Sequence, residues 1–447
     1  MENQENRGGN VAAIATMFAL FFMIAFVTNF ATPMGVIAKN QFQTSNFMSQ
    51  LGNAANFFAY LFMGIPGGLI LKRKGYKFTA LSAVAVGFVG LAVQLLSGFV
   101  GSFAVYVAGA FIAGFSMCML NLVVNPLLNT LGGEGKKGNQ LVQFGCSLNS
   151  IGATLSPMIL GWLIGEVTKD TKFITAAPAL GIAMGIFAVA FAIVALSRIP
   201  EPHMETAAEK AARLAGETSV LKDIVETLKF KHFVFGAIAI FFYIVIEVGV
   251  PSMGMLYMTE QIPVIGGIAK NGPGYVGGAI AGTVCGIYWF CMMIGRLLGG
   301  VVGGKFSSRA QVTFLATLGI LLLLAVMFVP ATMVELPIKT KVADVAGVVL
   351  EKNIQVPLNM CFMVLVGLCT SVMWGGIFNM AAEGLGKYVP MGSGIFMAMV
   401  CGGLLIPVQG LIADKVGILS SYWFSIALLA YVLLYALVLS KPMKRAE

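Results

Sequence analysis

Twelve apolar runs, each long enough to cross a lipid bilayer, constrain this chain more than any other feature. A membrane-spanning helix needs about 20 mostly apolar residues. Six runs precede a polar segment and six follow it, at 11–34, 46–71, 78–99, 101–131, 139–165, 173–197, 233–259, 275–303, 310–330, 356–385, 391–413 and 418–440. Runs of this kind exclude an outer-membrane barrel, whose strands alternate over about 10 residues. We predict an all-α polytopic membrane protein with 12 transmembrane helices.

Composition excludes the other large classes of protein. Only 11% of the 447 residues are charged and 58% are hydrophobic, whereas soluble domains carry about 25% charged residues. Intrinsic disorder needs a high charge that this chain lacks. The first apolar run is too long for the core of a signal peptide, so we expect it to be retained.

The distribution of Lys and Arg predicts the orientation in the membrane. Basic residues concentrate in the cytoplasmic loops of membrane proteins. With the N-terminus inside, 19 of the 28 Lys and Arg fall on the cytoplasmic side and 8 on the other, and Arg296 lies within a span. We expect both termini in the cytoplasm of a bacterium, with the chain in its inner membrane. The net charge of +9 then reflects topology, and we expect no nucleic-acid partner.

The polar segment divides the chain into two comparable parts. We predict an N-terminal six-helix bundle at 1–198, a cytoplasmic linker at 199–229 and a C-terminal six-helix bundle at 230–447. The linker and the loop at 331–355 are too short to bury a core. Gly67-Gly68 and Gly299-Gly300 each precede a basic loop, a faint repeat that favours paired, pseudo-symmetric bundles with a substrate site between them at mid-membrane.

No pattern in the sequence indicates an enzyme or a resident cofactor. The seven Cys form no CxxC or Cys/His cluster, and no phosphate-binding loop of the GxxxxGK[ST] type occurs. No nucleophile and base stand out as a pair. We expect neither a catalytic site nor a metal, and a protein that acts as a monomer.

Polar side chains within apolar runs are therefore the candidate functional residues, because burying them in a membrane is costly. The N-terminal part offers amides, among them Asn29, Asn121 and Asn149; the C-terminal part adds Asn379, Tyr243 and Trp374. Amides donate and accept hydrogen bonds, and aromatic rings stack on apolar faces, a combination that suits a neutral sugar. Each amide could equally bridge packed helices.

Two charged residues complete the set of candidates. Glu247 is the one acid near the centre of a predicted span. A carboxylate is costly to keep charged there, so Glu247 could take up a proton, bind sugar hydroxyls or pair with an Arg. Arg296 lies about one turn before Gly299-Gly300, where we favour a gating or interhelical contact. Oxygen atoms of Glu247 and the amides could also coordinate Na⁺.

Several motifs resemble those of one transporter family. They are Ile65-Pro66-Gly67-Gly68, Asn125-Pro126, Leu148-Asn149-Ser150-Ile151-Gly152, Tyr243 with Glu247-Val248, Ile294-Gly295-Arg296, and the stretch from Val372-Met373-Trp374 to Ala413-Asp414. Over most of its length the chain resembles the fucose/galactose/glucose:proton symporter (FHS) family of the major facilitator superfamily. The resemblance implies the major facilitator fold, uptake of hexoses by alternating access, and a sugar site near Asn121, Asn149, Glu247 and Trp374.

The chain also departs from the family pattern. Thr32 stands where the family usually has an acid, and Asn121 stands where the family carries Glu or Gln. The usual N-terminal proton carriers are thus missing. Any coupling is expected at Glu247, with H⁺ or Na⁺ as the coupling ion.

Our leading hypothesis is a secondary-active importer of a hexose-type sugar, working by alternating access and coupled to an ion. Two alternatives stay open: an uncoupled sugar facilitator, and a polyspecific drug exporter of the same fold that uses the many Phe and Met side chains. A membrane sensor is disfavoured because the sequence shows no signalling domain.

Overall fold

The computed structural model describes residues 2–28, 41–42, 51–133, 135–164, 173–214, 220–258, 264–265, 268–269, 277–343 and 349–442. The first part of the chain forms α1 (Glu2–Thr28), α4 (Leu51–Val100), α5 (Phe103–Leu131), α6 (Gly135–Ile164) and α7 (Phe173–Leu196). Two short helices follow, α8 (Ala207–Leu214) and α9 (Val220–Leu228). The last part forms α10 (Lys231–Leu256), α11 (Gly277–Gly303), α12 (Ser308–Phe328), α13 (Leu358–Thr370), α14 (Met373–Ala382), α15 (Val389–Ala398), α16 (Ile406–Val416) and α17 (Ile418–Leu434).

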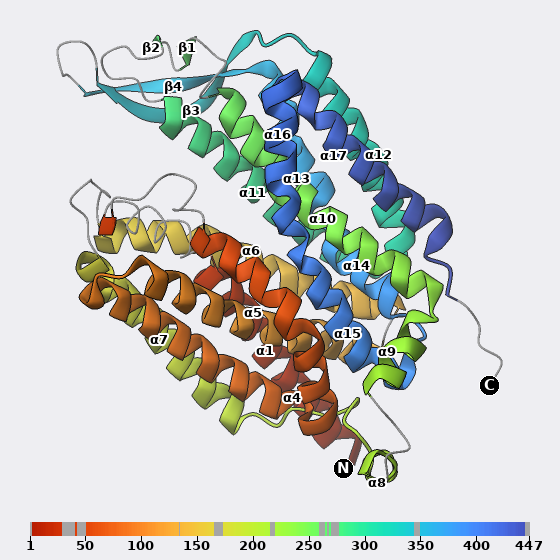
Figure 1. Cartoon of the computed structure of the whole chain (residues 1–447). Coiled ribbons are helices and arrows are strands. Elements are labelled where there is room, and N and C mark those ends of the chain that lie inside the picture. Colours follow the sequence, from red (N-terminus) through yellow and green to blue (C-terminus); the bar gives the residue numbers. More distant parts are fainter. Residues whose placement is uncertain are drawn as a thin grey trace.

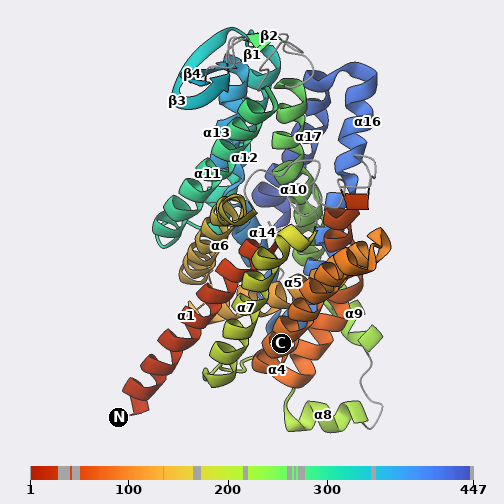
Figure 2. The ribbon, with the colours of Figure 1, turned by 90° about the vertical axis from the view of Figure 1, so that its left-hand side faces the viewer.

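The helices lie in two groups (Figure 1). Those coloured red to yellow, α1 to α7, occupy one side of the molecule, and those coloured green to blue, α10 to α17, occupy the other. The start of α1 and the last described residues lie at one end, with α8 and α9, which we call the termini end. The opposite end carries strands β3 (Met333–Ala343) and β4 (Val349–Pro357) and is called the hairpin end (Figure 2).

Each predicted span has a helix. Within the described residues, nine helices are long and apolar enough to cross a membrane. One of them, α4, contains two predicted spans, while α1 and α6 account for the first and the fifth. The helical part of the fold therefore agrees with the 12 spans predicted from the sequence.

A glycine divides α4 into its two spans. Gly75 has φ +83°, which strains any residue with a Cβ, and a Cβ there would also collide with the carboxylate of Glu201. That carboxylate accepts hydrogen bonds from the backbone N–H groups of Tyr76 and Lys77, the latter at 2.9 Å. Glu201 thus caps the second half of α4 from the linker.

Spans ten and eleven are interrupted, which the sequence did not predict. Two residues, Ser371 and Val372, separate α13 from α14, and the 3₁₀ segment η3 (Met399–Leu405) separates α15 from α16. At the first break, Ser371 O accepts from Arg296 Nε at 3.3 Å, and Val372 O accepts from Gln143 Nε2 at 2.9 Å. Broken helices persist at membrane depth where protein groups satisfy the backbone in this way.

Glycines bring the two groups of helices into close contact toward the termini end. A Cβ on Gly68 of α4 would lie 2.6 Å from Pro390 O and 3.1 Å from Gly394 Cα of α15. A Cβ on Gly300 of α11 would lie 2.7 Å from the Phe144 ring of α6. One glycine from each predicted pair therefore faces the opposite group, where a larger side chain would push the helices apart.

The linker is folded against this end of the molecule. Thr206 and Glu209 form a capping box at the start of α8, with Thr206 N 2.9 Å from Glu209 Oε2 and Glu209 N 3.3 Å from Thr206 Oγ1. An ion pair of 2.6 Å between Lys72 and Asp223 ties α9 to α4. The predicted linker thus contains two helices, α8 and α9, with 215–219 outside the described residues.

The region expected as a plain loop at 331–355 contains an antiparallel β-hairpin. Strands β3 and β4 pair from Met333 with Pro357 to Ala343 with Val349, with a register shift between Leu336 and Lys339. A short pair, β1 (Val264–Ile265) and β2 (Ile268–Ala269), lies at the same end. The Val and Ile residues in these segments favour strands.

Candidate functional site

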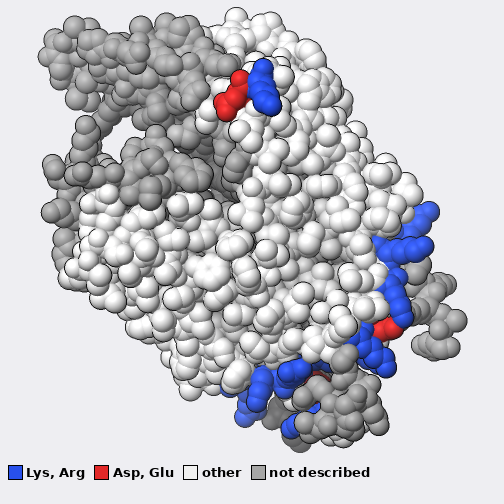
Figure 3. Space-filling view, in the orientation of Figure 1, with Lys and Arg blue, Asp and Glu red and all other residues white. Residues whose placement is uncertain are grey.

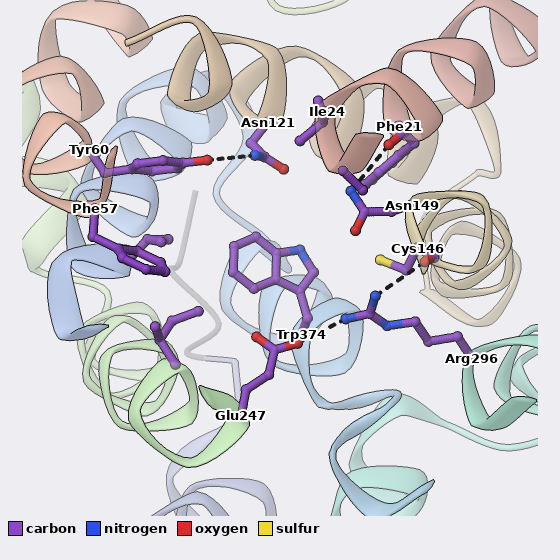
Figure 4. Close-up of a pocket in the computed structure, with 13 residues that line it drawn as sticks. Phe21, Ile24, Phe57, Tyr60, Asn121, Cys146, Asn149, Glu247, Arg296 and Trp374 are labelled. Atoms are coloured by element: carbon purple, nitrogen blue, oxygen red, sulfur yellow. Dashed lines mark hydrogen bonds and ion pairs between the residues drawn. The ribbon is translucent and has the colours of Figure 1, made fainter. Parts of the chain in front are cut away.

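A cavity of about 170 Å³ lies between the two groups of helices. Since a water molecule occupies about 30 Å³ of liquid, it has room for several waters or part of a small solute. From the first group it is lined by Phe21, Ile24, Ala25, Phe57, Tyr60, Asn121, Cys146 and Asn149, and from the second by Ile244, Glu247, Arg296, Trp374 and Val400. Figure 4 shows the Trp374 ring between these two sets.

Glu247 and Arg296 form an ion pair on the wall of the cavity. Arg296 Nη2 donates to Glu247 Oε1 at 3.0 Å, and both side chains are nearly buried. The guanidinium also reaches across to α6, where Nη1 donates to Ser150 Oγ at 2.7 Å and to Cys146 O at 3.3 Å. Arg296 therefore connects α10 and α11 with a helix of the opposite group (Figure 4).

Asn121 presents its amide to the cavity from α5. Its Nδ2 donates to Tyr60 OH and to Met117 O, both at 3.0 Å. One turn on, Asn125 donates to Asn121 Oδ1 at 3.3 Å and accepts from Trp374 Nε1 at 3.2 Å. Asn125 thus bridges the two groups of helices, whereas Asn121 is held in place at the cavity wall.

Asn149 and Tyr243 take different positions around the same centre. Asn149 lines the cavity from α6 and donates to Phe21 O at 3.2 Å. Tyr243 does not line it; the ring is fully buried one turn before Glu247 on α10, beside that carboxylate, with its centroid 6.4 Å from the Trp374 ring. Tyr243 therefore packs beside Glu247 and Trp374 without facing the cavity itself.

Asn379, like Tyr243, does not line the cavity. Asn379 lies five residues beyond Trp374 on α14, about 7.5 Å along the axis and on another face of the helix. It lines a separate pocket toward the termini end, where its Nδ2 donates to Ser308 Oγ at 2.8 Å. Asn29 lies outside the described residues.

The sequence analysis missed the aromatic wall contributed by α4. Phe57 and Tyr60 line the cavity, and the Tyr60 hydroxyl accepts from Asn121. One signal was available, since Tyr60 lies four residues after Asn56 and therefore on the same helical face as an amide within an apolar run. Ser150, the residue of α6 that contacts Arg296, carried no signal of its own, because serines commonly pack between helices.

Together these groups offer a mixed lining that suits a polar, uncharged solute. Amides and the guanidinium donate, the amide oxygens and the carboxylate accept, and Trp374, Tyr60 and Phe57 provide ring faces. No cluster of three or more His, Cys, Asp or Glu that could hold a metal ion occurs within the described part of the chain.

Comparison with known proteins identifies the fold family. Residues 14–350 match the Major Facilitator Superfamily. The chain belongs to this superfamily. Members of the superfamily are transporters rather than enzymes, in agreement with the sequence analysis, and the chain is a multi-pass membrane protein.

Curated relatives extend over nearly the whole chain. A glucose/galactose transporter of Brucella abortus is 26% identical over 442 residues, covering 98% of this chain and 96% of the relative. The L-fucose-proton symporter of Escherichia coli is 20% identical over 428 residues, covering 91% and 88%. A crystal structure of a variant of that symporter matches with a TM-score of 0.74 at 18% identity, covering 96% of this chain and 98% of the other. These findings agree with the predicted FHS family and the major facilitator fold.

Proposed function

We propose that this protein is a secondary-active transporter that imports a hexose-type sugar by alternating access, coupled to protons through Glu247 and Arg296. One observation carries the proposal: the ion pair lines the same cavity as Asn121 and Asn149, which come from the opposite group of helices. The relatives named as glucose/galactose transporter and as L-fucose-proton symporter support the choice of sugar and of proton.

The two parts at 1–198 and 230–447 are proposed as the bundles that move against each other, with 199–229 as the linker. The close contacts at Gly68 and Gly300 hold them together toward the termini end. Import requires these contacts to separate while the hairpin end closes. The interrupted helices beside Trp374 and Val400 give the second bundle places to bend.

The bonds of Arg296 suggest how protonation is linked to opening. Its partner Glu247 belongs to the same bundle, so their ion pair persists when the bundles separate, whereas its bonds to Ser150 and Cys146 must break. Without a proton on Glu247, its carboxylate still neutralises the charge of Arg296 when the bonds to α6 break. The empty carrier can then change conformation. With a proton on Glu247, the Arg296 guanidinium loses its ion-pair partner and relies on its bonds to Ser150 and Cys146 of α6. These bonds then hold the two bundles together at the termini end, because an unpaired buried charge is costly.

Sugar binding would allow the protonated carrier to open at the termini end. A hydroxyl in the cavity gives Arg296 a new acceptor and replaces the bonds to α6. The protonated carrier then opens only with sugar bound, which prevents a proton leak through the empty carrier.

The proposed orientation places the termini end in the cytoplasm of a bacterial cell, with the protein in the inner membrane. Lys and Arg gather at the termini end, while the sides of the molecule are nearly free of charge (Figure 3). This pattern is the one expected for cytoplasmic loops.

Uptake of radiolabelled glucose, galactose and fucose into proteoliposomes tests the proposal, with proton and sodium gradients imposed separately. We expect at least one sugar to accumulate under a proton gradient and only to equilibrate under a sodium gradient. Accumulation driven by sodium alone would contradict proton coupling. Equilibration under both gradients would indicate a facilitator. If no sugar enters and lipophilic cations stabilise the protein instead, the exporter alternative is correct.

A further inference from the structure

A groove between α1 and α7 lies on the lateral surface of the molecule and is separate from the central cavity. Its volume is about 430 Å³. Leu20 and Met23 of α1 lie at its buried floor, and Ile182, Val189 and Ile193 of α7 are its exposed rim. Among the described residues that line it, Thr16 is the one with a polar side chain.

Glycines on α7 leave this groove open. Gly185 lines it, and a Cβ added there would meet nothing within 4 Å; the same holds for Gly181 one turn earlier. The two helices meet at the termini end of the groove, where Thr16 Oγ1 and Ser197 Oγ are 3.0 Å apart. The hollow therefore results from missing side chains along a surface of otherwise large apolar residues.

The position of the groove exposes it to lipid. Ile182, Val189 and Ile193 are 44%, 61% and 41% exposed on a helix that is apolar enough to span the membrane. From Ile182 to Ile193 the helix rises about 16 Å. This length is close to one leaflet, since the hydrocarbon core is about 30 Å thick. One extended acyl chain has the length and the polarity to fill it.

Positive charge lies at the termini end of the groove, where a lipid headgroup would be. Arg198 directly follows Ser197 and is exposed. Lys77 Nζ donates to Ala195 O at 2.7 Å and to Ser197 O at 2.9 Å, which neutralises the carbonyl groups at the end of α7. The nearby acid Glu201 is engaged with backbone N–H groups of α4. An anionic headgroup is therefore favoured over a zwitterionic one.

We propose that the groove between α1 and α7 binds one acyl chain of an anionic phospholipid from the bilayer, with its headgroup phosphate at Arg198. This site is distinct from the sugar cavity, and the inference does not depend on the proposed function. An acyl chain held here would fill the gap between the first and sixth spans of the N-terminal part and connect them along one leaflet.

Native mass spectrometry of the full chain in detergent tests the proposal, with phosphatidylglycerol and phosphatidylethanolamine added in turn. Gly185→Leu puts a side chain into the groove at a position where an added Cβ meets nothing within 4 Å. Gly410→Leu, on α16 and outside the groove, is the matched control, because a Cβ there also meets nothing within 4 Å. Arg198→Gln tests the headgroup contact.

We expect wild-type protein and Gly410→Leu to retain one phosphatidylglycerol under conditions that strip phosphatidylethanolamine, and Gly185→Leu to lose it. Arg198→Gln should reduce the preference for phosphatidylglycerol about fivefold, the factor that one basic residue contributes near a membrane surface. Equal retention by Gly185→Leu and wild type would overturn the proposal. So would a protein dimer that Gly185→Leu dissociates while bound lipid stays unchanged, since the groove would then bind a second copy.

Discussion

At the scale of single residues, the cavity is defined by one ion pair and a few amides whose bonds fix where they point. Asn121 is held by Tyr60 and Met117, and Asn149 by Phe21. Each amide keeps capacity for a ligand, because an amide oxygen accepts two hydrogen bonds and its nitrogen donates two. Such preorganised groups bind a polar solute without first losing much side-chain entropy.

Asn121→Ala should weaken sugar binding without abolishing transport. The change removes an amide from the cavity wall and leaves the Tyr60 hydroxyl without its donor. A lost hydrogen bond costs about 0.5–1.5 kcal/mol, so KM for sugar uptake should rise about two- to tenfold with little change in maximal rate. Asn359→Ala is the control: Asn359 is equally buried but bonds Val326 O, away from the cavity. Equal KM values for the two variants would contradict the assignment of Asn121.

Sequence reasoning predicted the residues that bring charge or amides to the centre but not the roles of all of them. Glu247, Arg296, Asn121, Asn149 and Trp374 do share one cavity. Burial cost marks such residues in any apolar run, whichever way they face. This criterion does not show which way a residue faces. Asn379 faces another pocket because it lies five residues after Trp374, which rotates its position on the helix by more than a third of a turn.

At the scale of elements, close helix contacts and breaks decide where the molecule can open. Contacts at Gly68 and Gly300 hold α4 against α15 and α11 against α6. The sequence predicted tight glycines at these helix ends from their position before basic loops. It did not predict the breaks in spans ten and eleven. At the break in span ten, the freed carbonyl groups are satisfied by Arg296 and Gln143, residues far away in the sequence.

Gly68→Leu should favour opening at the termini end. The new side chain would collide with the backbone of α15 at Pro390, and overpacking costs about 1–3 kcal/mol, enough to shift the equilibrium about tenfold. Hydrogen–deuterium exchange of residues 389–398 should become about tenfold faster, while Gly410→Leu exchanges like wild type. Unchanged exchange in Gly68→Leu would show that this contact does not hold the bundles together.

The contact between the linker and α4 should respond to mild acid. His203 Nδ1 lies 2.6 Å from Tyr76 OH, and burial lowers the pKa of His203 below its usual 6.5. The folded state therefore binds fewer protons than the unfolded state, so the stability from His203 is complete above about pH 6.5 and declines as the pH falls through the lowered pKa. Burial raises the pKa of neighbouring Glu201, an effect of opposite sign that His203→Gln leaves in place.

Unfolding temperatures of wild type and His203→Gln, measured between about pH 7.5 and about pH 5.5, check this expectation. The wild type should lose more stability on acidification than His203→Gln does. Parallel curves would mean that His203 contributes no pH dependence.

At the scale of the whole molecule, two groups of helices meet around a polar cavity. The number of spans and the match to the Major Facilitator Superfamily were predictable, because they rest on long apolar runs and motifs read locally along the chain. Strands β3 and β4 were not predicted, since they contain Pro337 and several charged residues, which are uncommon in strands. Neither was the aromatic wall from α4, because Phe and Tyr abound on lipid-facing surfaces too.

The central claim is that Glu247 carries the proton that drives sugar accumulation. The most direct test is Glu247→Gln in proteoliposomes, measured by sugar-driven alkalinisation of a weakly buffered medium and, in parallel, by exchange of labelled sugar at equilibrium. Gln keeps the size of the side chain and can accept from Arg296, but it cannot take up a proton. Glu383→Gln is the control, because Glu383 lines a pocket outside the central cavity. We predict that Glu247→Gln exchanges sugar but neither accumulates it nor alkalinises the medium, while Glu383→Gln behaves as wild type. Alkalinisation and accumulation at wild-type levels in Glu247→Gln would contradict the account.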